Sequence, residues 1–278
     1  HASVGARASP PHTQSDDPRM RAAALLLVGG VGVVILLQYL TIVAGATTRL
    51  FGIDNGLTAR HFLTALTDSR AALVDTIMLA AVAAVVAAAA GMLVAFYTAR
   101  TRLAGRHALD FLANLPLAVP GTVVGLGLAL AFSQRPLLLT GTAAIIVIAF
   151  VVRSLPYTVR SGVAAFGQLH RSLDEASVCM GATQAQTLRR VLLPLVRPAI
   201  VAGMIFTFTR SVTTLSAVIF VVSPHWSLVT PAILSQMDRG DVGEAAALSM
   251  ILVVLVLAAI HGTPRLFGRD WRERQRGA

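Results

Sequence analysis

Long apolar runs separated by short polar stretches dominate this sequence. Six of the runs reach about the 20 residues that an α-helix needs to cross the hydrocarbon of a bilayer. They cover residues 22–45, 71–98, 109–132, 137–157, 198–222 and 243–263. The pattern predicts an all-α membrane protein with six transmembrane helices in a domain over residues 21–264. Residues 1–20 are polar and rich in proline and serine, which indicates a disordered tail or linker, and residues 265–278 form a basic tail.

The second and third runs carry residues that favour close contact between helices. The run at 71–98 is rich in alanine, and small side chains let membrane helices approach one another. The run at 109–132 contains two prolines, which bend helices, and three glycines: Pro116, Pro120, Gly121, Gly125 and Gly127. Because no strand precedes these glycines, we interpret them as a packing face and not as a nucleotide-binding loop.

A long polar insert at residues 159–195 interrupts the apolar pattern. Apolar residues recur at helical spacing from Leu173 to Gly181, and a second apolar stripe runs from there to Pro194. We expect two short helices joined at Gly181, where a glycine allows a sharp bend. Periodicity alone leaves two hypotheses open: a loop that packs on its own bundle, or a docking surface for another protein.

Composition narrows the chemistry. The 278 residues are 55% hydrophobic and only 13% charged, which is typical of a membrane protein. All 23 basic residues are arginine, so the chain has no lysine for a P-loop, and ATP-driven transport would need an ATPase on another chain. The single Cys179 excludes an internal disulfide, and the seven histidines show no metal-ligand spacing. We therefore expect no cofactor and no metal site in this chain.

The arginines follow the topology. They gather beside the first run, at 100–106, at 153–197 and in the tail, whereas the alternate loops carry few. The positive-inside rule therefore places both termini and the insert in the cytoplasm. This distribution also explains the net charge of +10 without a nucleic-acid partner.

Arg210 is the one charge that the pattern places deep inside a span. On a helical projection it shares a polar face with Gly203, Thr207, Ser211 and Thr214. A charge in a span faces a water-filled path or the bundle interior because lipid exposure is costly. Thr207, Arg210, Ser211 and Thr214 are therefore candidates for a substrate path that suits an anion; the alternative is that Arg210 only locks the bundle.

The insert contains a spaced pattern. Glu175-Ala176-Ser177, then Gly181 after three residues, then Val191-x-Leu193-Pro194 after nine more resemble the EAA loop of binding-protein-dependent ABC importer permeases. Ser177 stands for the second alanine of that pattern and Val191 for its isoleucine. The resemblance implies a coupling helix that docks on a separate ATPase subunit. The residues that it assigns to this coupling are Asp174, Glu175, Ala176, Ser177, Gly181, Ala182, Leu193 and Pro194.

Two further stretches, Leu115–Phe132 and Arg210–Val222, are similar to the ferric-iron-type branch of these permeases. The resemblance implies an inner-membrane permease subunit, itself not an enzyme. Its expected partners are ABC ATPase subunits, a second permease half, an extracytoplasmic substrate-binding protein and membrane lipid. The second half would be an identical copy, a different chain or an upstream part of a fused permease, for which the start at His1 leaves room. Ferric iron is the expected substrate; a phosphonate or another small anion is the alternative, followed by thiamine or a polyamine.

Two other classes of function make different demands. A secondary transporter fragment would carry inward-facing carboxylates in its spans and no docking loop, and the sequence shows the opposite. A membrane enzyme would need a catalytic motif, and neither Gly-x-Ser-x-Gly nor His-Glu-x-x-His occurs. The acidic stretch Asp238–Glu244 lacks the ligand spacing of a calcium loop, so we interpret it as a solvated outer loop or a docking edge for the substrate-binding protein.

Overall fold

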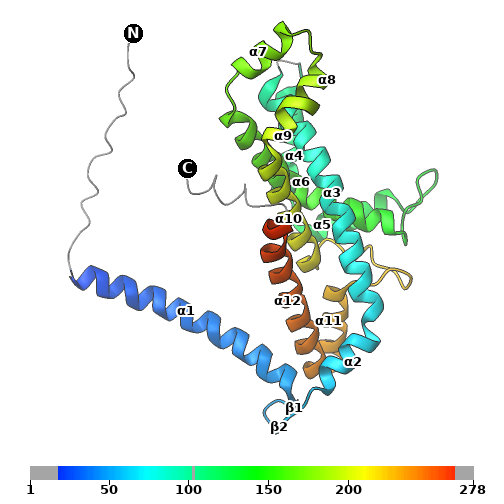
Figure 1. The fold of residues 1–278 in the computed structure, drawn as a ribbon. Coiled ribbons are helices and arrows are strands. Elements are labelled where there is room, and N and C mark those ends of the chain that lie inside the picture. Colours follow the sequence, from blue (N-terminus) through cyan, green and yellow to red (C-terminus); the bar gives the residue numbers. More distant parts are fainter. Residues whose placement is uncertain (1–17, 102–103, 267–278) are drawn as a thin grey trace.

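The computed structural model describes residues 18–101 and 104–266, and helices make up most of that part (Figure 1). The long helices are α1 (Pro18–Thr47), α3 (Arg70–Arg100), α6 (Ala143–Gln168) and α12 (Val242–Leu266). Among the described residues, these four are long and apolar enough to span a membrane, and the number rises to six if two bent helix pairs each count as one span. Residues 18–20 of the expected tail form the first turn of α1, and residues 265–266 end α12; the rest of both tails lies outside the described residues.

Helix α3 is the centre of the bundle and packs against α6 and α10 (Arg197–Thr213). Seven of its alanines are buried, whereas its valines at positions 82, 85 and 86 are exposed. Gly91 lies so close to α6 that an added Cβ would overlap Thr158. The expectation that small residues bring these helices together is confirmed.

The third predicted span is not a single helix. Helices α4 (Arg106–Ala118) and α5 (Gly121–Ala131) meet at an angle of 112°. Pro120 precedes α5 and holds Val119 in an extended conformation, because a residue before proline is excluded from the helical region. The bend that the prolines predicted is therefore confirmed, and it is sharp enough to divide residues 109–132 between two helices.

The glycines of α5 contact the segment that follows α10. A Cβ at Gly125 would lie 2.5 Å from the backbone oxygen of Ala217, and one at Gly121 would overlap Ser216. Gly127 has open space around it. The predicted packing face thus consists of Gly121 and Gly125 without Gly127.

These glycines provide a matched pair for a test of packing. We expect Gly125→Ala to lower the free energy of unfolding by about 1–3 kcal/mol, because the backbone of Ala217 would have to move. Gly127→Ala should be neutral or stabilising by up to about 1 kcal/mol, since alanine is the better helix former. Thermal unfolding of both variants in detergent micelles measures the difference, and equal midpoints would contradict the close contact.

The fourth and fifth predicted spans are shifted or shortened. Helix α6 begins at Ala143, six residues later than the predicted start, and it continues to Gln168 into the polar insert. Helix α10 ends at Thr213, and residues 214–222 form turns beside α5, in which Ala217, Val218 and Val221 are buried. Val218 and Val221 of these turns pack in a core with residues of α3 and α6. These apolar side chains therefore belong to the protein interior and do not continue the membrane span.

Helix α11 (Val229–Asp238) lies between the fifth and sixth predicted spans and just before most of the predicted outer loop Asp238–Glu244. Its start is fixed to α3, because the Ser227 N–H donates to Asp75 Oδ2 at 3.2 Å and the Val229 N–H donates to Thr76 Oγ1 at 2.9 Å. The sixth predicted span is confirmed as α12, which packs against α11.

Helix α1 runs away from the bundle and contacts α12 only near its own C-terminal end (Figure 1). Of its residues, only Gly45 and Ala46 are buried, although it is apolar on all sides. Such a helix requires lipid or another protein around it. The loop expected after it contains a two-stranded antiparallel sheet, β1 (Thr48–Leu50) and β2 (Asp54–Leu57), and helix α2 (Arg60–Asp68).

Candidate functional site: the coupling loop and the arginine-lined helices

The candidate docking loop lies at one end of the molecule, opposite to β1, β2 and α2 (Figure 1). It comprises α7 (Ser172–Cys179), α8 (Gln184–Thr187), a π-helical turn η1 (Leu188–Leu192) and α9 (Leu193–Leu195). Together α8, η1 and α9 meet α10 at an angle of 74°. The segment therefore forms an elbow immediately before the first residues of α10.

Helix α7 ends at Gly181 as the sequence predicts. Gly181 has a φ of +80°, and its N–H donates to the oxygen of Val178 while the Ala182 N–H donates to the oxygen of Ser177. This pair of hydrogen bonds is a Schellman motif, which needs the left-handed conformation at the glycine. Thr183 then begins α8 with a capping box to Gln186.

One face of α7 is open to solvent. Glu175, Ala176 and Cys179 are exposed, Val178 is 61% exposed and Met180 is 83% exposed. Apolar side chains at such exposure, next to one carboxylate, are a surface suited to contact with another protein.

Two of the predicted coupling residues point inward instead. Ser177 is buried and its hydroxyl is 2.8 Å from that of Thr187, which also donates to the oxygen of Thr183. The Asp174 carboxylate accepts a hydrogen bond of 2.8 Å from Arg100. Both residues therefore hold the loop together from within.

The remaining predicted coupling residues lie in the turn after α7, which contains Ala182, and at the base of the loop, which contains Leu193 and Pro194. Ala182 and Leu193 are half-buried, and Pro194 is exposed. Leu193 packs against the cluster that joins the loop to α3 and α6, in which Leu192 and Phe166 are fully buried. This packing fixes the elbow to the bundle.

The polar face of α10 divides into two parts. Gly203, Thr207 and Ser211 are buried within the bundle, and Thr207 Oγ1 and Ser211 Oγ have no hydrogen-bond partner among the described residues. Arg210 and Thr214 are partly exposed. The helical projection was correct for the shared stripe, but only its edge reaches the surface of this chain.

Arg210 lies at the end of α10, three residues before Thr213, and not in the middle of a long span. Its guanidinium carbon is 5.9 Å from the centroid of the Tyr157 ring, which is within cation–π range. Its Nε is buried and makes no hydrogen bond to the described residues. Arg210 therefore keeps capacity to bind an acceptor.

Arg153 is the first of the arginines at 153–197 that the positive-inside rule assigned to the cytoplasmic side. It lies well inside α6, and its Nη1 donates to the oxygen of Pro116 at 2.9 Å and to that of Val119 at 3.0 Å. These carbonyls end α4 at the bend before α5. The combination of an arginine in one apolar run with two prolines in another was the available signal.

The same face of α6 carries further polar side chains. Tyr157 and Arg160 follow Arg153 at helical spacing, and Arg160 Nε donates to Asn114 Oδ1 of α4 at 3.0 Å. Within residues 18–101 and 104–266, no three side chains of histidine, cysteine, aspartate or glutamate come close enough to hold a metal ion. Arginine therefore dominates the polar chemistry around the α4–α5 bend.

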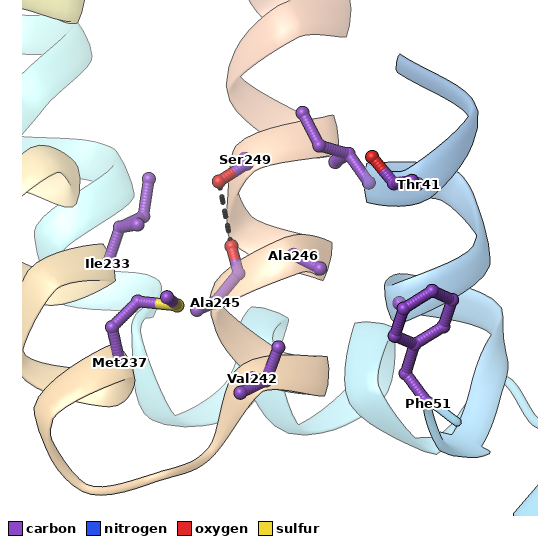
Figure 2. A pocket seen from close by; sticks show the side chains of 10 residues that line it. Thr41, Phe51, Ile233, Met237, Val242, Ala245, Ala246 and Ser249 are labelled. Atoms are coloured by element: carbon purple, nitrogen blue, oxygen red, sulfur yellow. Dashed lines mark hydrogen bonds between the residues drawn. The ribbon is translucent and has the colours of Figure 1, made fainter. Parts of the chain in front are cut away.

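A separate groove of about 280 Å³ lies between α1, α11 and α12, far from the coupling loop (Figure 2). Phe51, Ile233 and Met237 contribute to its largely apolar lining. The hydroxyl of Ser249 donates a hydrogen bond of 2.8 Å to the backbone oxygen of Ala245. The groove offers hydrocarbon contact and no built polar site.

The solved structures that resemble this chain are ABC transporters. A subunit of a bacterial transporter involved in the import of the acidic polysaccharide alginate matches with a TM-score of 0.69 and 18% identity over 90% of this chain and 96% of that one. A subunit of the MetNI methionine transporter matches with a TM-score of 0.59 at 18% identity over 76% of this chain and 97% of the other. The chain therefore has the type I ABC importer permease fold.

Sequence relatives agree with the fold. The ferric transport system permease protein FbpB of Actinobacillus pleuropneumoniae is 36% identical over 80% of this chain, and the chain spans about a third (33%) of that relative's length. The putative 2-aminoethylphosphonate permease protein PhnV of Salmonella typhi is 28% identical over 91% of this chain and 97% of its own length. Residues 87–262 match the family described as "Binding-protein-dependent transport system inner membrane component". This chain is a member of that family of inner-membrane transport components.

Proposed function

We propose that this chain is a permease subunit of an ATP-driven importer, in which α7 docks on a separate ATPase subunit. The exposed face of α7, fixed by the Schellman turn at Gly181, carries this proposal. Family membership supports it, because a binding-protein-dependent transport component works with a protein that delivers substrate. The arginine distribution supports a cytoplasmic position for α7 and for both termini.

The chain requires partners to complete a path across the membrane. It spans about a third of the length of the ferric transport relative, and α1 stands away from its own bundle. A second permease half, within the same polypeptide or on another chain, would cover such surfaces. We propose that the two halves line one path, with an ATPase at each coupling loop and a substrate-binding protein on the outer face.

Ferric iron is the substrate that we propose first. The 36% identity to the ferric transport permease protein supports it. A second candidate is a small oxyanion such as a phosphonate, because the PhnV relative aligns over nearly its whole length and because Arg210 and Arg153 bring positive charge to the helices near the bend. Ferric iron carried with a coordinating anion satisfies both observations.

Stimulated ATP hydrolysis by the reconstituted complex is the test of this function. We expect one ligand among ferric iron, aminoethylphosphonate, sulfate, thiamine and spermidine, loaded on its binding protein, to stimulate hydrolysis. Glu175→Ala should abolish the stimulation without loss of the permease from the membrane, because Glu175 is exposed. If no ATPase co-purifies and an ion gradient alone drives uptake, the chain is part of a secondary transporter.

Arg210 allows a test of the path. We expect Arg210→Gln to raise the half-saturating concentration for an anionic substrate about tenfold, since a charge-assisted hydrogen bond contributes about 1.5–3 kcal/mol. Arg210→Lys should retain most of the affinity. Uptake titrations with equal amounts of assembled complex measure this, and unchanged affinity in both variants would assign Arg210 to bundle packing.

A further inference from the structure

We propose that Arg100 is the positioning residue that ties the coupling helix α7 to α3 and α6, so that a displacement of α7 moves the centre of the bundle. The inference rests on the proposed importer function for its consequence, but the connection itself can be measured separately. It assigns Asp174 to this internal connection and not to contact with the ATPase.

Arg100 joins the ends of three helices. It is the last residue of α3, and its side chain is only 5% exposed. Nη1 donates to Asp174 Oδ2 in the first turn of α7 at 2.8 Å. Nη2 donates to the oxygens of Phe166 and Leu169 at the end of α6, at 2.5 and 2.7 Å.

Each of these hydrogen bonds stabilises the helix end that it reaches. The last carbonyls of a helix have no partner within the helix, and a cation there also complements the negative end of the helix dipole. The first turn of a helix favours a negative side chain such as Asp174. A guanidinium can serve both ends at once, because its donors lie on separate nitrogens in a rigid plane, whereas a lysine has a single nitrogen.

Helix α7 has little apolar burial of its own, because Ser177 is its one buried residue. Residues 169–171 form the link, and beyond it Leu173 is exposed. Among the described residues, two side-chain connections join α7 to elements beyond its own link: Arg100 with Asp174 on one side, and Ser177 with Thr187 on the other. The first leads to α3 and α6, and the second leads through η1 to α10.

Helix α7 is therefore linked separately to α3 with α6 and to α10. Because α3 packs against both α6 and α10, a rigid bond from α7 to the end of α3 passes movement to the central helix directly. Without that bond, movement of α7 would reach the bundle only through the elbow at α10. The Arg100–Asp174 pair should therefore govern how much transport each ATP yields, and not whether the ATPase binds.

The first measurement reports the connection without reference to transport. Cys179 is the single cysteine of this sequence and is exposed at the end of α7, so a spin label there reports the mobility of the helix. We expect Asp174→Ala to increase the label's mobility in the permease in lipid nanodiscs, with partner cysteines replaced. Asp174→Glu, which keeps the carboxylate, should restore the wild-type spectrum.

The second measurement is the ratio of substrate imported to ATP hydrolysed by the complete transporter. We expect Asp174→Ala and Arg100→Lys to lower this ratio about fivefold or more, while both variants still assemble with the ATPase. The control is Asp54→Ala, which removes the exposed pair of Asp54 with Arg49 (3.6 Å; side chains 52% and 66% exposed) at the far end of the molecule. This variant should leave both measurements unchanged.

The outcomes separate the inference from the proposed function. Wild-type label mobility and a wild-type ratio in Asp174→Ala overturn the inference, as does a loss of ATPase assembly in that variant, which would make Asp174 a docking residue. Arg100→Ala could fail to fold because it removes the buried donor to the oxygens of Phe166 and Leu169, so Asp174→Ala, which keeps that donor, is the decisive variant. Absence of any ATPase with the wild-type chain would overturn the proposed function but leave the mobility result valid.

Discussion

Replacing Gly181 with valine should abolish coupled uptake while the permease remains in the membrane. Gly181 has a φ of +80°, and a left-handed conformation costs an L-residue about 1–2 kcal/mol, more for a β-branched one. A Cβ at this position would meet no other atom, so the effect comes from the backbone alone. The Schellman turn would open, and α7 would no longer present Glu175 and Met180 at the angle set by α8.

The matched variants make this test sharp. Gly181→Asn should retain most of the uptake, because asparagine tolerates the left-handed conformation and the site has room for its side chain. Gly52 has a φ of +84° and equally open surroundings, but it lies in the turn between β1 and β2. Gly52→Val should therefore carry similar backbone strain and leave uptake near normal. Stimulated ATP hydrolysis and substrate uptake in proteoliposomes measure all three, and normal coupling in Gly181→Val would exclude the role of the turn.

The helices of the candidate docking loop could be predicted from the sequence because local rules determine them. A glycine after a short amphipathic helix is a sufficient signal for a helix end, and the spacing from Glu175 to Pro194 fixes the lengths on both sides. The direction in which each side chain points could not be predicted in the same way. Asp174 and Ser177 point inward because Arg100 and Thr187 lie there, and both partners come from other elements of the chain.

The number of predicted membrane spans agrees with the structure if each bent helix pair counts as one span, whereas the bends and ends of the helices differ from the prediction. Hydropathy measures how long an apolar run is, and it does not reveal whether the backbone of that run is helical throughout. Residues 214–222 are mostly apolar, yet they form turns beside α5, in which Ala217, Val218 and Val221 are buried. The bend between α4 and α5 likewise depends on Arg153, whose contacts join residues 34 and 37 positions apart.

The same limit applies to the polar stripe of α10. Periodicity places Thr207, Arg210 and Ser211 on one face, but it cannot distinguish a face toward the path from a face toward the protein's own bundle. Thr207 and Ser211 are buried against the bundle, and only Arg210 and Thr214 remain partly accessible. A path through this chain would therefore be lined by α10 near its end and by the neighbouring polar face of α6.

Removal of Arg153 should release the bend between α4 and α5. Its two hydrogen bonds to carbonyls are charge-assisted, and each contributes about 1.5–3 kcal/mol. Replacement by leucine also removes the cost of a charge within the span, about 2.5–3.5 kcal/mol, so the two effects largely cancel. We expect Arg153→Leu to lower the free energy of unfolding by only about 1–2 kcal/mol. Uptake should fall further, by about tenfold or more, because the carbonyls of Pro116 and Val119 lose the donor that fixes the angle of α5.

Substitution by lysine should have different effects at Arg153 and at Arg100. Both bonds of Arg153 come from a single nitrogen, Nη1, so an ammonium group could replace them, whereas Arg100 uses two nitrogens for three acceptors. Arg153→Lys should therefore keep most of the uptake, and Arg100→Lys should not. Arg160→Gln, at an exposed position on the same helix, is the control and should change the stability by no more than about 0.5 kcal/mol. Thermal unfolding and uptake measured on the four variants would reject this account of the bend if Arg153→Leu transported normally, since the α4–α5 angle would then hold without a donor at its carbonyls.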